Sequence, residues 1–130
     1  QKHVVLALQL LIQLLFYHKL FFKHQLIIMN NKINLRLNND IYRGNSFVFF
    51  YNEIPIVSFK GETIAGALLA NEIKICRITN KINESRGFYC GMGTCWECTM
   101  IVNDTHSVRT CITLCKPEMK VKTQIGNRID

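Results

Sequence analysis

The sequence predicts an α+β domain in which a mixed sheet packs against one helix. Three observations support this class: two aromatic and branched segments joined by a short turn, a helical segment after Gly61, and two strand-like segments that follow a cysteine-rich loop. The chain has 130 residues, of which 48% are apolar, so it is long enough to bury one core but not two. This order of hairpin, helix, cysteine loop and strands is typical of a β-grasp domain.

The first two strands form the predicted hairpin. SFVFFY at residues 46–51 and IPIVSF at residues 54–59 are rich in residues that favour strands. Asn52 and Glu53 between them predict a two-residue turn, although Asn-Glu is a weaker turn signal than Asn-Gly. Pro55 has no backbone N–H to donate, so we expect its strand near an edge of the sheet.

A helix follows the hairpin. Thr63 can cap a helix over residues 64–72, IAGALLANE. Ile64, Ala67 and Leu68 would share one face of that helix, and we expect this face to pack on the sheet.

The last predicted elements lie on the far side of the cysteine loop. TMIV at residues 99–102 predicts a strand, and Asn103 with Asp104 predicts the turn that ends it. MKVKT at residues 119–123 alternates in polarity, which predicts a last strand.

The first 28 residues differ from the rest of the chain. They hold no acidic residue and an apolar run from Val4 to Tyr17, which is shorter than the roughly 20 residues that span a bilayer. Met29 opens a more polar segment. We therefore expect residues 1–28 to be an apolar extension outside the fold and residues 29–130 to form the domain; a membrane anchor is the competing interpretation.

The net charge of +7 falls to +4 when residues 1–28 are left out. Three of the 16 Lys and Arg residues lie in residues 1–28, which leaves 13 basic against 9 acidic side chains. The basic residues are scattered and are not interleaved with aromatic ones, so we expect no nucleic-acid partner.

Four of the six cysteines carry the strongest signal in the sequence. The spacing C-x4-C-x2-C, followed after twelve residues by another cysteine, is the plant-type arrangement for a [2Fe-2S] cluster. The predicted ligands are Cys90, Cys95, Cys98 and Cys111. Gly91 and Gly93 lie between the first two cysteines, where they allow the backbone to approach the cluster closely and to adopt unusual dihedral angles.

Other uses of the cysteines stay open. Disulfides would leave the spacing and the glycines unexplained. A structural zinc site with the spacing C-x2-C-x12-C-x3-C would use Cys95, Cys98, Cys111 and Cys115, but it would leave Cys90 without a role. Cys76 and Cys115 are otherwise expected to be small core residues.

Three side chains near the cysteines have less certain roles. Trp96 would shield the cluster, contact a partner or pack in the fold. Arg86 would hydrogen-bond the loop backbone or be a surface cation. His106 is expected to be a solvated histidine in a surface turn.

RGFYCGMGTCWECTMIVND, followed by VRTCITLCKPEMKVKTQ, resembles the small (2Fe-2S)-binding, ferredoxin-like subunits of flavin-dependent amine and amino-acid oxidoreductases. These include the small subunits of hydrogen cyanide synthase, opine oxidase and proline or hydroxyproline dehydrogenase, and the N-terminal domain of large sarcosine oxidase subunits. The resemblance runs from about Asn45 to Gln124. It places the cluster ligands on the four predicted cysteines.

The resemblance implies a subunit that is not catalytic alone. It implies a [2Fe-2S] cluster in this chain, an FAD-dependent oxidoreductase partner that holds the flavin, and relay of single electrons to or from that partner. A free-standing plant-type ferredoxin and a zinc-stabilised interaction module remain the alternatives. We expect a cytoplasmic location.

Overall fold

The computed structural model describes Gln9 and residues 12–15, 34–37 and 39–126. The chain divides into two compact units, Gln1–Lys32 and Ile33–Asp130. Gln9 and residues 12–15 of the first unit are helical. The predicted start of the fold at Met29 lies outside the described residues. Of the helices within those residues, which omit most of the first 33, none is both long and apolar enough to cross a membrane.

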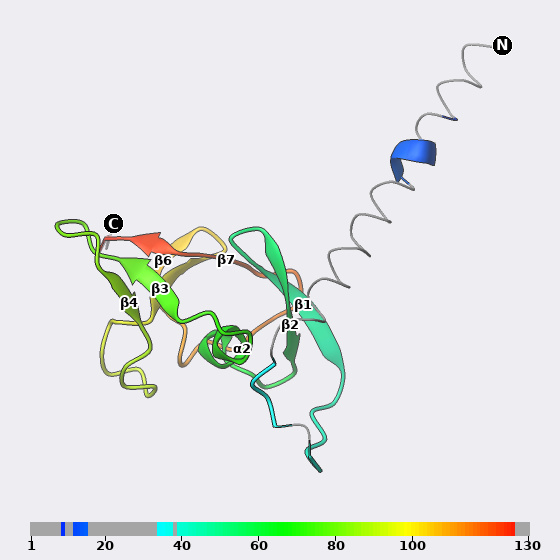
Figure 1. The fold of residues 1–130 in the computed structure, drawn as a ribbon, viewed down its shortest axis with the longest axis horizontal. Helices are drawn as coiled ribbons and strands as arrows, with labels where there is room; N and C mark the ends of the chain where they lie inside the picture. The colour runs from blue at the N-terminus through cyan, green and yellow to red at the C-terminus, as the bar shows by residue number, and fades with distance from the viewer. Residues whose placement is uncertain (1–8, 10–11, 16–33, 38, 127–130) are drawn as a thin grey trace. The chain divides into compact units, whose positions relative to one another are not determined.

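The second unit is an α+β domain, as predicted (Figure 1). A five-stranded mixed sheet has the order β2-β1-β7-β5-β6, and a three-stranded sheet has the order β4-β3-β8. The strands of the larger sheet are β1 (Ser46–Tyr51), β2 (Ile54–Phe59), β5 (Thr99–Val102), β6 (Thr105–Arg109) and β7 (Lys120–Lys122). Those of the smaller sheet are β3 (Ile75–Ile78), β4 (Ser85–Gly87) and β8 (Gln124–Ile125). Parallel pairing of β1 with β7 and of β3 with β8 makes both sheets mixed.

The predicted hairpin forms with its expected ends. Asn52 and Glu53 both have positive φ, at 44° and 69°, which is the backbone that a two-residue type I′ turn requires. Asn103 and Asp104 do the same between β5 and β6. Pro55 lies in β2 at the edge of the larger sheet, where its missing N–H leaves no gap in the ladder.

Helix α2 (Ile64–Ala70) packs against β2 and ends two residues before the predicted end (Figure 1). Thr63 caps it by accepting a hydrogen bond from the Gly66 amide at 3.1 Å. Ile64, Ala67 and Leu68 are fully buried, as expected for the face toward the sheet. The sheet side of the core includes Phe49, Ile56, Met100 and Val121.

The N-terminus of α2 also supports a segment that carries one of the predicted ligands. The first amides of a helix have no partner within the helix. Here Ile64 N donates to Thr113 O at 2.9 Å and Ala65 N donates to Thr110 O at 3.1 Å. These bonds fix the turn after β6, which contains Cys111.

Candidate metal centre

The predicted ligands come from two segments of the domain. Cys90, Cys95 and Cys98 lie in the loop between β4 and β5, and Cys111 lies just after β6. Because β5 and β6 are antiparallel neighbours, the end of the loop and the start of the turn meet at the same edge.

A buried threonine joins these two segments. Thr110 is fully buried, and its amide and hydroxyl both donate to the Cys98 carbonyl, at 3.3 and 2.7 Å. Cys111 therefore lies beside Cys98. Burial raises the pKa of the Cys111 thiol, and its hydrogen bond with the Cys98 thiol raises that pKa further.

The Cys90 sulfur lies among backbone donors. Cys95 N is 3.4 Å and Met92 N is 3.5 Å from Cys90 Sγ. Hydrogen bonds from these amides, that of Cys95 first, lower the pKa of the Cys90 thiol to about 6. The thiolate is the form that binds metals, so this loop favours the ligating state.

The four predicted thiols form two interacting pairs. After the backbone amides, the neighbouring Cys95 thiol also lowers the pKa of Cys90. After burial, the Cys98 thiol raises the pKa of Cys111, and the charge of Cys90 raises it further. In the described part of the chain, no three or more His, Cys, Asp or Glu side chains are grouped so that they could hold a metal ion. Four thiolates, two for each iron, are the ligands of a [2Fe-2S] cluster, so the chemistry and pairing of these donors fit that group.

Both predicted glycines have left-handed backbone. Gly91 has φ +68° with open space around it, and Gly93 has φ +77°. A Cβ on Gly93 would also lie 2.9 Å from Ile112 Cγ2 in the turn that carries Cys111. The unusual dihedral angles expected of these glycines are present, and Gly93 also lets the two cysteine segments approach each other.

Cys115 lies in a different environment from the four thiols. It is buried, its amide donates to Glu62 O at 2.9 Å, and its thiol interacts with Ser58. Burial raises the pKa of its thiol. These contacts match the expected core role rather than the zinc alternative, which needs Cys115 among the ligands.

Cys76 lies behind the four thiols, in β3. It is fully buried, as predicted, and burial followed by the charge of Cys98 raises its pKa to about 12. It therefore stays a neutral thiol on the core side of the centre.

The structure favours one of the two roles left open for Arg86 and corrects the position of His106. Arg86 is a partly exposed cation that pairs with Glu84 at 2.7 Å and with Glu97 at 3.9 Å. The side chain of Arg109 bonds the loop backbone, at Gly93 O. His106 lies in β6 rather than in a turn, although it is exposed as expected. The turn consists of Asn103 and Asp104 alone, because β6 begins at Thr105 and therefore includes His106.

Sequence reasoning missed Arg109. Its guanidinium carbon lies 4.6 Å from the centre of the Trp96 ring, so both side chains belong to the loop surface. The sequence did offer a signal for Arg109, which stands two residues before Cys111. Antiparallel pairing of its strand with the strand after the loop would place it beside the loop.

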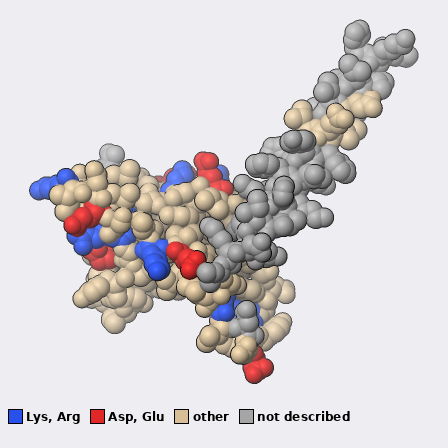
Figure 2. Space-filling view, in the orientation of Figure 1, with Lys and Arg blue, Asp and Glu red and all other residues tan. Residues whose placement is uncertain are grey.

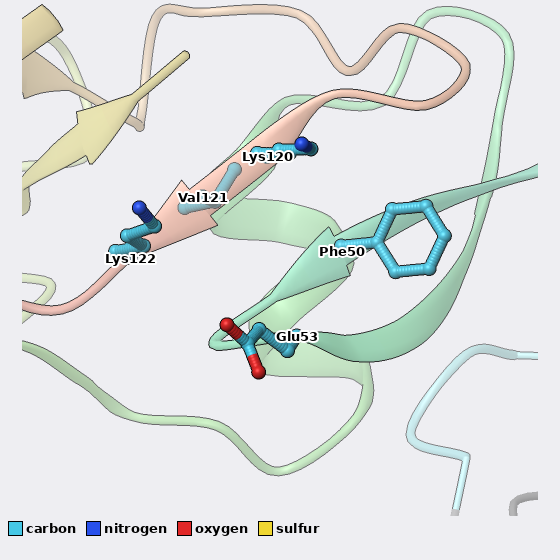
Figure 3. A pocket seen from close by; sticks show the side chains of 5 residues that line it. All are labelled: Phe50, Glu53, Lys120, Val121 and Lys122. Carbon is cyan, nitrogen blue, oxygen red and sulfur yellow. The ribbon is translucent and has the colours of Figure 1, made fainter. Parts of the chain in front are cut away.

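None of the predicted ligands lines the hollow that Figure 3 shows. It measures about 330 Å³ and is lined by Phe50, Glu53, Lys120, Val121 and Lys122, which come from β1, its turn and β7 (Figure 3). Basic and acidic side chains are interspersed on the face of the described residues that Figure 2 presents. The cysteine loop is therefore the part of the domain with distinctive chemistry.

Four cysteines on a loop and a turn of a β-grasp domain are typical of iron–sulfur proteins of the electron-transfer class. The chain belongs to the family of 2Fe-2S iron-sulfur cluster binding domains, whose model matches residues 44–126. The fold class and the resemblance predicted from the sequence are both confirmed.

The chain is similar to curated proteins over the same region. It is 37% identical over 79 residues to the hydrogen cyanide synthase subunit HcnA of Pseudomonas protegens, covering 60% of this chain and 72% of that protein. It is 32% identical over 80 residues to HcnA of Pseudomonas aeruginosa, covering 61% and 74%.

A solved structure shares the fold. The crystal structure of L-proline dehydrogenase from P. horikoshii has a TM-score of 0.56 and 24% identity, and the match covers 68% of this chain. It spans only 18% of that dehydrogenase chain, so the likeness concerns the fold alone.

Proposed function

We propose that this chain is an electron-transfer subunit with one [2Fe-2S] cluster on Cys90, Cys95, Cys98 and Cys111. It would relay single electrons to or from an FAD-dependent partner that oxidises an amine or amino acid. The observation that carries the proposal is the arrangement of four thiols as two pairs, with backbone amides directed at Cys90. The HcnA relatives are named as subunits, which supports a role within a complex.

The bound cluster would supply reversible one-electron transfer, which no side chain of this domain offers by itself. The residues of the chain set the conditions for it. Amides of Met92 and Cys95 stabilise negative charge on sulfur, and Gly93 lets the loop close over the turn. Thr110 keeps Cys111 in register with Cys98.

The loop surface is suited to contact with a partner. Exposed apolar side chains lie in or beside it, where a partner's redox group would approach closest: Tyr89, Met92, Trp96 and Ile112. Exposed apolar groups gathered near a functional site are typical of protein contacts. A subunit role is therefore favoured over a free-standing carrier.

We also propose a cytoplasmic location. All six cysteines are in the described part of the chain and form no disulfide there. Thiols persist in reducing compartments, which supports this location.

Metal analysis of anaerobically purified protein tests the function. We expect a red-brown protein with about two irons and two acid-labile sulfides per chain, and an electron paramagnetic resonance signal after one-electron reduction. Colourless protein with stoichiometric zinc would instead establish the structural zinc site.

A further inference from the structure

Arg109 connects strand β6 to the cysteine loop. It is half-buried and lies two residues before Cys111. Its Nη1 donates a hydrogen bond to the Gly93 carbonyl, and its guanidinium lies over the Trp96 ring. One cation thus contacts the loop at two points between the first and third predicted ligands.

The carbonyl that Arg109 holds lies between two amides that donate to a predicted ligand. Met92 N is 3.5 Å and Cys95 N is 3.4 Å from Cys90 Sγ. Gly93 stands between Met92 and Cys95 in the loop, so Arg109 fixes the backbone that directs both donors at Cys90.

Gly93 is also close to the turn that carries Cys111. A Cβ on Gly93 would lie 2.9 Å from Ile112 Cγ2, in that turn. Displacing Gly93 would therefore disturb both the donors to Cys90 and the close approach of the two cysteine segments.

The charge of Arg109 differs from that of the neighbouring arginines because its contacts in the described part of the chain include no carboxylate. The other two arginines near the loop face Glu97: Arg77 at 2.9 Å and Arg86 at 3.9 Å. Arg109 instead directs its charge at a carbonyl and an indole ring. The ring covers one side of the guanidinium, and cover from water reduces screening.

We propose that Arg109 is a positioning residue that holds the loop backbone at Gly93, so that the Met92 and Cys95 amides stay directed at Cys90, and that it raises the reduction potential of the cluster. The inference rests on the proposed function. Reduction would add one negative charge to the bound cluster, and a nearby cation with well-directed amides would stabilise the reduced state more than the oxidised one.

Redox titration of purified variants, followed by electron paramagnetic resonance, tests this inference. Arg109→Gln should lower the equilibrium constant for reduction at least tenfold, a fall of about 59 mV for a one-electron couple. Arg109→Lys keeps the charge but loses the planar guanidinium, so its reduction potential should lie between those of the parent protein and Arg109→Gln. Arg43→Gln is the matched control, because its guanidinium bonds Leu37 O outside the loop; its equilibrium constant should change less than threefold.

The iron and sulfide content of the parent protein is measured first and tests the proposed function separately. With a cluster in the parent, an Arg109→Gln protein that keeps its iron and reduces within threefold of the parent overturns the inference. A fall in Arg109→Lys as large as that in Arg109→Gln also overturns it. If Arg109→Gln loses its iron, the Trp96→Leu variant is measured instead. It keeps the bond from Arg109 to Gly93 but exposes the guanidinium to water, which screens its charge. A lower potential at full iron content then supports the inference, and an unchanged one overturns it.

Discussion

At the scale of single residues, six cysteines of the same chemistry have different environments. Cys90 has backbone donors around its sulfur, whereas Cys115 is buried beside Ser58 and Glu62. The first environment stabilises a thiolate and the second a neutral thiol. Removing the thiol should therefore destroy the cluster at Cys90 and leave it intact at Cys115.

Cys90→Ser should abolish the cluster or make it unstable, because a serine hydroxyl is a poor replacement for a thiolate ligand. Cys115→Val should keep the visible absorption and cost less than about 1.5 kcal/mol of stability, since valine is close to cysteine in size. Absorption spectra and iron content of the two purified variants measure this. The reverse ranking, with iron lost from Cys115→Val alone, would contradict the ligand assignment.

The two loop glycines differ in what surrounds them. Alanine at either position has to adopt positive φ, at a cost of roughly 1–2 kcal/mol. At Gly93 the new methyl group would also meet Ile112, whereas at Gly91 it would meet open space. We expect Gly93→Ala to lose iron several times faster than Gly91→Ala during incubation with a chelator. Equal rates would show that backbone conformation alone matters, and the double variant Gly93→Ala with Ile112→Ala should recover part of the loss.

The four cysteines and two glycines could be singled out from the sequence because metal binding would impose a local spacing on it. Arg109 could not, because its bond to Gly93 spans 16 residues and depends on how β6 pairs with β5. A bond to the loop backbone was one of two roles considered for Arg86, because Arg86 is near the loop in sequence, but its ion pairs with Glu84 and Glu97 fit the other role, a surface cation. Proximity along the chain is a poor guide where a strand pairing brings distant residues together.

At the scale of elements, the hairpin, the capped helix and the strand after the loop follow from patterns that are local. Strands β3, β4, β6 and β8 were missed. Strand β6 has five residues and pairs with β5, whereas the other three are two to four residues long. Strand β3 also depends on a non-local pairing, since it pairs in parallel with β8, at Arg77 with Gln124. Such short strands carry too few residues for a periodic signal, so their existence depends on the tertiary fold.

A second non-local feature ties the segment before β1 to the domain. Arg36 precedes the region matched by the family, and it forms a two-pronged ion pair with Glu62, both contacts at 2.8 Å. Glu62 also accepts hydrogen bonds from the Ser58 hydroxyl and the Phe59 amide. Burial pushes the pKa of Glu62 up, but Arg36 and these donors together hold it below its usual value.

Glu62→Gln should destabilise the domain by about 1–3 kcal/mol at pH 7, because Arg36 loses its carboxylate. A carboxyl whose pKa is lowered by folding stabilises above its unfolded pKa, near 4.5, and loses that contribution as the pH falls through its folded pKa. The difference between parent and variant in urea unfolding should therefore shrink below about pH 4.5. Glu53→Gln, in the exposed hairpin turn, is the control and should show little difference at any pH. A constant Glu62→Gln difference from pH 7 to pH 3 would rule out the linkage.

At the scale of the whole molecule, most of the cysteine loop is exposed at the surface of the domain, and only its end is buried. Trp96 is 51% exposed and Met92 is 72% exposed, whereas Cys98 at the end of the same loop is buried. Electron transfer requires close approach of a partner to this surface, and apolar side chains there gain from being covered. Charge is less informative here, since acidic and basic groups are mixed on the face in Figure 2.

Co-expression with a flavoprotein encoded beside this chain's gene should give one co-eluting species. Addition of an amino-acid substrate should reduce the flavin first and bleach the cluster second, because substrate oxidation delivers electrons to the flavin. Trp96→Ala should slow the second step at least several-fold while iron content stays unchanged, if its ring lies in the contact; Tyr42→Phe, on an exposed side chain of the segment before β1, is the control. Stopped-flow absorption at the flavin and cluster bands measures both steps. A chain that never co-elutes with a flavoprotein, yet exchanges electrons readily with a ferredoxin reductase, would establish the free-standing carrier instead.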